Sequence, residues 1–237
     1  MQINYIGHST VELVDGDTRV LIDPFLKPNN PAAKVTAEEV EPTHVFITHA
    51  HADHFADAVA VGKRTGASFV AITELANVLE EQGVEDVADA NMGGIVSFDW
   101  GWVKLVQSHH TSTVPGSADR PYSPTAGTVI GAACGVVVNL GGKTFYHLGD
   151  TALFSDLKLI TERTPADVAF IPIGGHYTMH REDAAVAAEF VGAEVVIPVH
   201  YNTFPVIETD AEAFKAEVES KTDSKVVVLA PGESHEA

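Results

Sequence analysis

Short apolar runs that alternate with polar positions dominate the start of the chain, and this is the pattern of β-strands. Ile3 to Ile6, Ser9 to Val14 and Arg19 to Asp23 form such runs, and Asp15-Gly16-Asp17 supplies turn residues between the last two. The sequence therefore predicts an N-terminal β-meander.

The rest of the chain alternates between strand and helix patterns. We expect further strands over residues 44–48, 68–72, 95–98, 102–108, 134–140, 144–148, 168–171, 195–199 and 225–229. We expect helices over residues 55–65, 74–82, 182–191 and 211–221. A strand-rich half followed by a half that alternates strands and helices favours an α/β fold with two packed sheets and helices outside, a four-layer αββα sandwich. No linker-like change of composition divides the chain, so we expect residues 1–237 to form one domain.

The segment Thr111 to Gly127 lacks an apolar period and holds three of the chain's twelve prolines, so a long loop is predicted there. Such a loop is either a functional lid or a plain surface excursion. Arg120 within it and Arg181 further on can each bind a substrate phosphate or carboxylate, or lie free on the surface.

Composition narrows the class of protein. Hydrophobic residues make up 45% of the chain and charged residues 20%, as in ordinary globular proteins. The formal net charge of −19 would repel a phosphate backbone, so nucleic acid is not an expected partner. Cys134 is the single cysteine, which excludes an intramolecular disulfide and a site built from several thiolates. We expect a cytoplasmic protein, because neither a signal peptide nor a membrane-spanning segment is recognisable.

A dense group of metal-binding residue types follows the predicted strand over residues 44–48. Four of the six residues in His49-Ala50-His51-Ala52-Asp53-His54 are histidine or aspartate, whose nitrogen and oxygen atoms suit zinc and similar cations. His49 and His51 are spaced to meet one ion, and Asp53 and His54 can face a second site beside it. The pattern predicts a metal-binding loop between a strand and a helix.

One loop cannot complete two metal sites, so further ligands are expected where other strands end. His109 and His110 follow one predicted strand, Asp150 follows another, and His200 ends a third. A single histidine at a strand end is more often an ordinary polar residue, and the joint placement of these residues is what indicates a metal centre.

The order of these motifs resembles that of the metallo-β-lactamase superfamily. The resemblance rests on His-x-His-x-Asp-His, a later histidine, Gly149-Asp150-Thr151 and Pro198-Val199-His200-Tyr201, and it spans nearly the whole chain. Four flanking motifs look like those of a branch of metal-dependent hydrolases related to ascorbate-6-phosphate lactonase. They are Gly7-His8-Ser9-Thr10, Leu21-Ile22-Asp23-Pro24-Phe25, Pro172-Ile173-Gly174-Gly175-His176-Tyr177-Thr178-Met179 and His200-Tyr201-Asn202-Thr203-Phe204-Pro205.

The resemblance implies a set of metal ligands. A first ion would be held by His49, His51 and His110, a second by Asp53, His54 and His200, and Asp150 would bridge the two. His110 is preferred over His109 because Thr111-Ser112 matches the small hydroxyl residues that follow the family ligand. The cofactors expected are two divalent metal ions, zinc or manganese.

The resemblance also implies a reaction. Two ions that share a water of lowered pKa would supply hydroxide to cleave a small ester, lactone or phosphoester. Asp150 would orient this nucleophile, and His8 and His176 resemble family positions that line the site and help to polarise the substrate. His180 departs from the family pattern and is expected to be a surface side chain. The expected partner is a small-molecule substrate, and a homo-oligomer is possible.

Three rival functions remain open at this level. A diiron redox protein of the same superfamily usually has Glu where His51 stands and carries a flavin domain for which this chain has no room. A nuclease conflicts with the charge of −19. A non-catalytic metal-binding module would keep the fold and the ligands without turnover.

Overall fold

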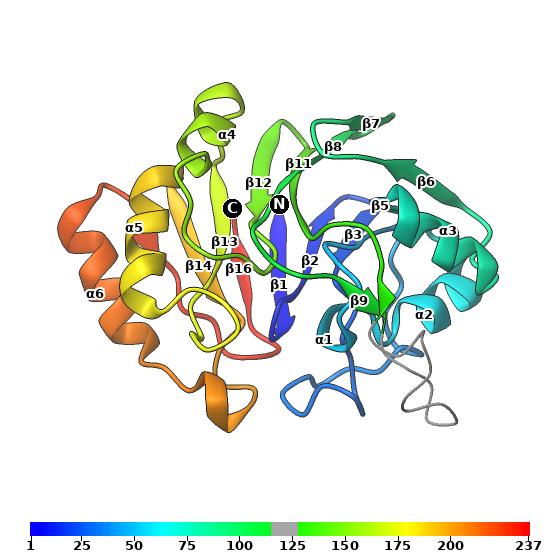
Figure 1. The fold of residues 1–237 in the computed structure, drawn as a ribbon, viewed down its shortest axis with the longest axis horizontal. Coiled ribbons are helices and arrows are strands. Elements are labelled where there is room, and N and C mark those ends of the chain that lie inside the picture. The colour runs from blue at the N-terminus through cyan, green and yellow to red at the C-terminus, as the bar shows by residue number, and fades with distance from the viewer. Residues whose placement is uncertain (115–127) are drawn as a thin grey trace.

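Two seven-stranded sheets form the centre of the computed structural model, which describes residues 1–114 and 128–237. The first sheet has the strand order β16-β1-β2-β3-β4-β5-β6. Its strands are β1 (Gln2–Gly7), β2 (Thr10–Asp15), β3 (Thr18–Ile22), β4 (His44–Phe46), β5 (Ser68–Ile72), β6 (Val87–Ala90) and β16 (Ser234–Glu236). Because β16 pairs with β1, the two ends of the chain lie side by side (Figure 1).

The second sheet has the strand order β15-β14-β13-β12-β11-β8-β7. Its strands are β7 (Ile95–Phe98), β8 (Gly101–Gln107), β11 (Cys134–Leu140), β12 (Lys143–His147), β13 (Val168–Pro172), β14 (Val195–Val199) and β15 (Lys225–Val226). A separate two-stranded ribbon joins β9 (Thr113–Val114) to β10 (Thr128–Val129).

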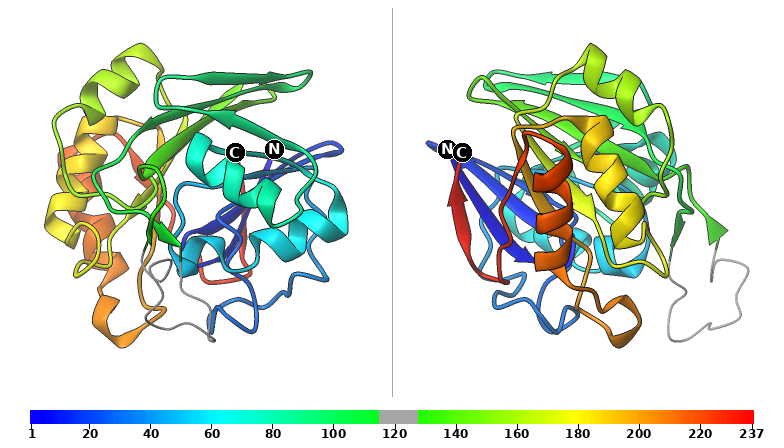
Figure 2. Two further views of the ribbon diagram at one scale, coloured as in Figure 1. Left: turned by 45° about the vertical axis from the view of Figure 1, so that its right-hand side comes forward. Right: turned by 90° about the vertical axis from the view of Figure 1, so that its left-hand side faces the viewer.

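Helices cover the outer faces of the two sheets (Figures 1 and 2). The first sheet carries α1 (Ala52–Phe55), α2 (Ala58–Thr65) and α3 (Thr73–Glu81), and the second carries α4 (Leu157–Arg163), α5 (Arg181–Val191) and α6 (Ala211–Lys221). A short 3₁₀-helix, η1 (Pro205–Ile207), precedes α6. The predicted four-layer αββα sandwich is confirmed.

The hydrophobic core follows the two-residue period of the strands. In β11, Val136 and Val138 pack with the first sheet, whereas Val137 packs with the residues that α5 and α6 bury. In β13, Phe170 likewise belongs to the layer between the sheets, and Ile171 to the layer under the helices. Because successive side chains of a strand point to opposite faces, a fully apolar strand such as β11 can serve both layers.

Strand direction brings the ends of several strands to one edge of each sheet. β8 and β12 are both antiparallel to β11, so they run the same way, and β13 and β14 run parallel to β12. In the first sheet, β1 and β3 are both antiparallel to β2, and β4 runs parallel to β3. In each sheet these strands therefore end on the same side. The residues that directly follow β1, β3 and β4 gather at the strand ends of the first sheet, and those that follow β8, β12 and β14 gather at the strand ends of the second.

The structure differs from the predictions where the sequence pattern is weak. The short edge strands β6 and β16 were not expected, because their half-exposed residues form no apolar run. Helix α4 was also missed. The helix predicted over residues 55–65 begins earlier and is divided at Ala56 and Asp57, where the Asp57 carboxylate accepts hydrogen bonds from the Leu26 backbone and the Asn29 side chain instead of capping α2.

Two further predictions need correction. The long loop predicted over residues 111–127 contains strand β9, and its remaining residues 115–127, with Arg120, lie outside the described residues. The strand predicted over residues 225–229 ends at Val226. Among the helices of the described residues, none combines the length and the apolar character needed to cross a bilayer.

Candidate metal centre

His49 and His51, in the loop between β4 and α1, and Asp53 and His54, in α1, turn their side chains towards ligand groups from other strands. His49 and His54 are fully buried, and His51 and Asp53 are partly exposed. The apolar strand β4 is an inner strand, and it places this loop where the strands of the first sheet end, opposite the ends of β8, β12 and β14 of the second sheet. The site is therefore assembled from both sheets.

Three groups of possible ligand atoms meet there, each with its atoms within 4.8 Å of one another. The first group comprises His49, His51 and His110. The second comprises His8, Asp53, His54 and His200, and the third joins His49 and His54 to Asp150. The structure thus brings together all seven residues that the sequence proposed as metal ligands.

Asp150 lies between the first two groups. Its Oδ2 atom is 3.9 Å from Nε2 of His49, 3.6 Å from that of His110, 3.4 Å from that of His54 and 3.1 Å from that of His200. One carboxylate oxygen therefore faces four imidazole nitrogens that come from three different segments of the chain.

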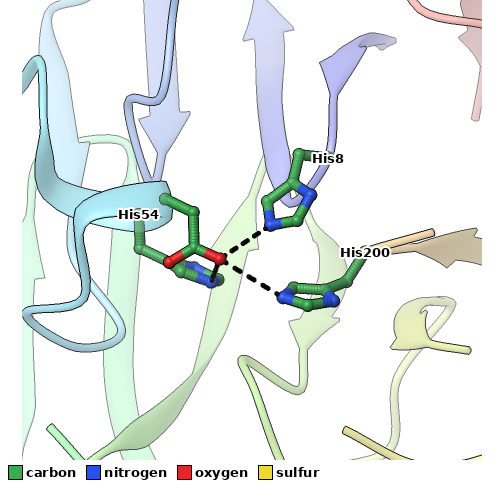
Figure 3. Close-up of side chains that lie close together, drawn as sticks. His8, His54 and His200 are labelled. Atoms are coloured by element: carbon green, nitrogen blue, oxygen red, sulfur yellow. Dashed lines mark hydrogen bonds and ion pairs between the residues drawn. The ribbon is translucent and has the colours of Figure 1, made fainter. Parts of the chain in front are cut away.

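Asp53 is the corresponding carboxylate of the second group. Figure 3 shows His8, His54 and His200 turned towards one carboxylate oxygen, which is Oδ2 of Asp53. The distances to Nε2 are 3.1 Å from His8, 3.9 Å from His54 and 3.6 Å from His200. His8 is close enough to donate a hydrogen bond, and its Nδ1 lies 2.9 Å from the Thr203 hydroxyl oxygen.

The fully buried carboxylate of Asp23, which follows β3, orients two of the histidines. It accepts hydrogen bonds from Nδ1 of His54 at 2.7 Å and from the Thr48 hydroxyl at 2.6 Å. The Thr48 hydroxyl is in turn 3.0 Å from Nδ1 of His49. With Nδ1 engaged in each ring, the Nε2 lone pairs of His49 and His54 are free to face the centre, the usual role of a carboxylate behind a metal-binding histidine.

The backbone around the centre is strained. His8, Asp23 and His200 adopt left-handed conformations, with φ of 60°, 50° and 55°. Non-glycine residues rarely occupy this region, and such residues cluster at functional sites. The His8 carbonyl oxygen accepts hydrogen bonds from the His200 backbone N–H at 2.8 Å and the Tyr5 hydroxyl at 3.0 Å, which fixes the two turns against each other across the sheets.

The electrostatics divide the histidines into two kinds. Burial lowers the pKa of His49, His51 and His110, so these rings are neutral and suited to bind a cation. Burial also opposes protonation of His200, but Asp150 and Asp53 outweigh it and raise the pKa of His200 to about 9. The pKa of Asp150 is held well below its usual range by His200 and His54, against the effect of burial.

These groups fit a metal ion because their polar atoms lack other partners. Among the buried side-chain atoms of the described residues, Nε2 of His54, both ring nitrogens of His200 and Oδ1 of Asp150 have no hydrogen-bond partner. Unpaired buried polar atoms are costly, and native proteins rarely contain several together. Divalent cations bound by nitrogen and oxygen would satisfy most of them.

Other predicted residues lie away from the centre. His109 stacks on Phe154, with ring centroids 4.4 Å apart, and belongs to none of the three ligand groups, whereas His110 belongs to the first. His180 is exposed and is 2.9 Å from the Glu182 carboxylate, as expected of a surface residue. Arg181 also contacts Glu182.

His176, predicted to line the site, is exposed, packs edge-on against Tyr177 and belongs to none of the three ligand groups. His176 has a left-handed backbone conformation, with φ of 51°, and is one of five non-glycine residues in the described part of the chain that adopt it. The structure thus does not bring the His176 side chain to the ligand groups.

A cleft of about 710 Å³ leads to the centre. Its described lining residues are His51, Asp53, His110, Thr111, Asp150, Tyr177, Phe204, Pro205 and Val206. The cleft is large enough for a small molecule. Sequence reasoning did not find Asp23 or Thr203 as contacts of the site, although each stands in a motif that the resemblance singled out.

Comparison with known proteins places this geometry in a family. A family model described as a beta-lactamase superfamily domain matches residues 2–200. The chain is 47% identical, over 99% of both chains, to a UPF0173 metal-dependent hydrolase of Symbiobacterium thermophilum. It is 45% identical to a UPF0173 metal-dependent hydrolase of Thermus thermophilus, over 93% of this chain and 92% of that one.

A solved structure shares the fold throughout. Igni18, a metallo hydrolase from the archaeon Ignicoccus hospitalis, aligns with a TM-score of 0.86 and 36% identity, over 100% of this chain and 98% of that one. The relation to ascorbate-6-phosphate lactonase stays a prediction.

Proposed function

Because this chain belongs to the UPF0173 family of metal-dependent hydrolases, within the β-lactamase superfamily, we propose that it is a binuclear hydrolase with one metal site on each side of Asp150. One observation carries the proposal: Oδ2 of Asp150 lies within 4 Å of four imidazole Nε2 atoms, two from each proposed site. A carboxylate in that position can serve two cations at once.

We assign the ligands of each ion from the first two groups of ligand atoms. His49, His51 and His110 would hold the first ion, and Asp53, His54 and His200 the second. Zinc or manganese suits this mixture of nitrogen and oxygen donors. When bound, two such ions would lower the pKa of a shared water to about 7 and polarise the bond to be cleaved.

The protein's own groups supply the remaining chemistry. Oδ1 of Asp150 is buried and without a hydrogen-bond partner in the described residues, so it can accept a hydrogen bond from an attacking water and orient it. His8 is neutral, because burial and the neighbouring His200 lower its pKa to about 4. In a neutral His8, Nδ1 accepts a hydrogen bond from the Thr203 hydroxyl. Its Nε2–H then donates a hydrogen bond to the Asp53 carboxylate and holds that carboxylate in place.

The substrate class follows from the size of the cleft and the chemistry of the centre. We propose a small ester, lactone or phosphoester as substrate, in a cytoplasmic protein that has neither nucleic acid nor a membrane as partner and can assemble as a homo-oligomer. The net charge of −19 supports the exclusion of nucleic acid as a partner, because it would repel a phosphate backbone.

Metal content per chain tests the binuclear assignment. Elemental analysis of natively purified protein should give about two equivalents of metal, falling to about one in an Asp53→Ala, His200→Ala double variant and in a His51→Ala, His110→Ala double variant. His180→Ala is the matched control, since the side chain of this histidine is 77% exposed and belongs to none of the ligand groups, and the variant should keep two equivalents. One equivalent in the unaltered protein would contradict the proposal.

Turnover separates an enzyme from a non-catalytic metal-binding module. Loaded protein should hydrolyse members of a panel of nitrophenyl esters, lactones and phosphodiesters, and removal of the metal should abolish this activity. Two bound equivalents with no turnover of any panel member would favour the non-catalytic module.

A further inference from the structure

The outer part of the cleft is apolar. Beyond the ligand groups it is lined by Tyr177, Phe204, Pro205 and Val206. Tyr177 is 57% exposed and Val206 is 53% exposed. Phe204 joins this apolar wall to the metal centre, because its ring centroid lies 5.6 Å from that of His8. We use "apolar wall" for these four residues.

The apolar wall comes from two separate segments of the chain, and buried neighbours keep its exposed side chains at the surface. Tyr177 stands in the loop between β13 and α5, whose Gly175 backbone N–H bonds to the carbonyl of the buried Met179 at 2.9 Å. Val206 stands in η1, which the fully buried Ile207 anchors beneath it. Because each loop is fixed by a buried neighbour, the exposed side chains cannot simply fold into the core.

Exposure alone does not make these residues functional. Ile95 is 58% exposed and Leu159 is 55% exposed, and neither lies near the metal centre; single apolar side chains at a surface are ordinary. Tyr177 and Val206 differ because they share one cavity with His51, His110 and Asp150. A molecule that is bound at the ligand groups and fills the outer part of this cleft therefore contacts them.

Charge restricts what that molecule can carry. Asp53 and Asp150 are the carboxylates on the cleft surface, and no lysine or arginine is among the residues of the described segments that line it. An anionic substituent against the apolar wall would lose its hydration without gaining a described cationic partner. An uncharged apolar group would instead cover exposed side chains and gain from the hydrophobic effect.

We propose that the substrate carries an uncharged aromatic or alkyl group next to the scissile bond, and that this group packs between Tyr177 and Val206. The inference rests on the proposed function for the location of the scissile bond. It narrows the substrate class to uncharged apolar esters or lactones and disfavours substrates with an anionic group at this position.

An ester series with a constant leaving group tests the proposal. From p-nitrophenyl acetate through butanoate to pentanoate, kcat/KM should rise about three- to fourfold per added methylene, the gain expected for burying one methylene. The hemisuccinate ester, which replaces the end of the pentanoyl chain by a carboxylate, should fall below the acetate.

Matched variants locate the effect. Tyr177→Ser and Val206→Ser should flatten the dependence of kcat/KM on chain length. Ile95→Ser and Leu159→Ser, which lie outside the cleft lining, should leave both the acetate rate and this dependence unchanged. Equal rates for all chain lengths, or a preference for the hemisuccinate, would overturn the proposal.

A binding measurement keeps this inference separate from the proposed function. N-benzylacetamide, an uncharged amide, should bind metal-free protein in saturation-transfer NMR, and Val206→Ser should weaken its binding while Ile95→Ser does not. Binding of this pattern without turnover of any ester, lactone or phosphodiester of the panel would refute the hydrolase but support the apolar wall as a ligand site. Turnover without N-benzylacetamide binding and without chain-length dependence would support the hydrolase and refute the apolar wall as a ligand site.

Discussion

Replacing Asp23 by asparagine should weaken the second metal site with only a modest loss of fold stability. The amide can keep its oxygen at the Oδ1 position, which accepts the Thr48 backbone N–H at 2.7 Å. Its nitrogen then stands where Oδ2 faced the Thr48 hydroxyl and Nδ1 of His54, at 2.6 and 2.7 Å. A donor opposite Nδ1 forces that nitrogen to accept, so the proton of the His54 ring moves to Nε2.

The size of the effect follows from this change of tautomer. Nε2 of His54 is buried without a partner and lies 3.4 Å from Oδ2 of Asp150, in the position of a metal ligand. A proton on Nε2 blocks its lone pair. Loss of the carboxylate behind a metal-binding histidine costs about 10- to 100-fold in metal affinity, which is about 1.4 to 2.7 kcal/mol. Urea unfolding of the metal-free variant should show a loss of about 1 to 3 kcal/mol from the weakened hydrogen bonds.

Asp57→Asn is the matched control. Asp57 is also buried and accepts the Leu26 backbone N–H and the Asn29 side chain, but it contacts none of the ligand groups. It should lose a similar free energy of unfolding and keep its metal affinity. Chelator competition on metal-free protein measures the affinity of each equivalent. If Asp23→Asn bound its second equivalent as tightly as the unaltered protein, or if Asp57→Asn lost as much affinity, the orienting role of Asp23 would be wrong.

Three further predictions concern backbone fit, pH and metal removal. Gly174→Ala should lower metal content and cost about 1 to 3 kcal/mol in urea unfolding, because the added Cβ would overlap the carbonyl oxygen of His200; normal metal content would contradict this. Burial lowers the pKa of His44, whose Nε2 accepts the Trp100 indole N–H at 3.0 Å. Its NMR titration should therefore lie below about 6.5 and rise in Trp100→Phe, and its contribution to stability should be lost as pH falls below about 6.5, where the unfolded histidine binds its proton more readily. A chelator should lower the melting temperature, since metal at 1,000 times its Kd adds about 4 kcal/mol to the free energy of unfolding; an unchanged melting temperature would mean that the ligand groups hold no metal.

Much of the site was predictable because its ligands lie at strand ends. His49, His51, Asp53 and His54 are neighbours in the sequence, so the apolar strand β4, the loop that follows it and the first turn of helix place all four. Their assignment as metal ligands stays a prediction that the elemental analysis tests. The four-layer fold was predictable for a similar reason, since apolar runs of strand length report burial directly.

What the sequence could not show are contacts between distant segments. Asp23 meets His54 across 31 positions, and His8 meets Thr203 across 195. No local pattern encodes such pairs, because they depend on how the two sheets pack. The side chain of His176 illustrates the opposite case: its motif suggested the site, but the fold leaves it exposed beside Tyr177.

By itself, then, the sequence determined the sheet-forming runs, the metal-binding loop and the strand ends at which further ligands stand, since each is a local property of residue type and spacing. Only the tertiary structure decided that Asp150 faces both groups of histidines, that Asp23 orients His54, and that Tyr177 and Val206 share one cleft. The physical reason is that these contacts depend on strand direction and on the packing of one sheet against the other, and both are fixed by burial of the whole core rather than by any single segment.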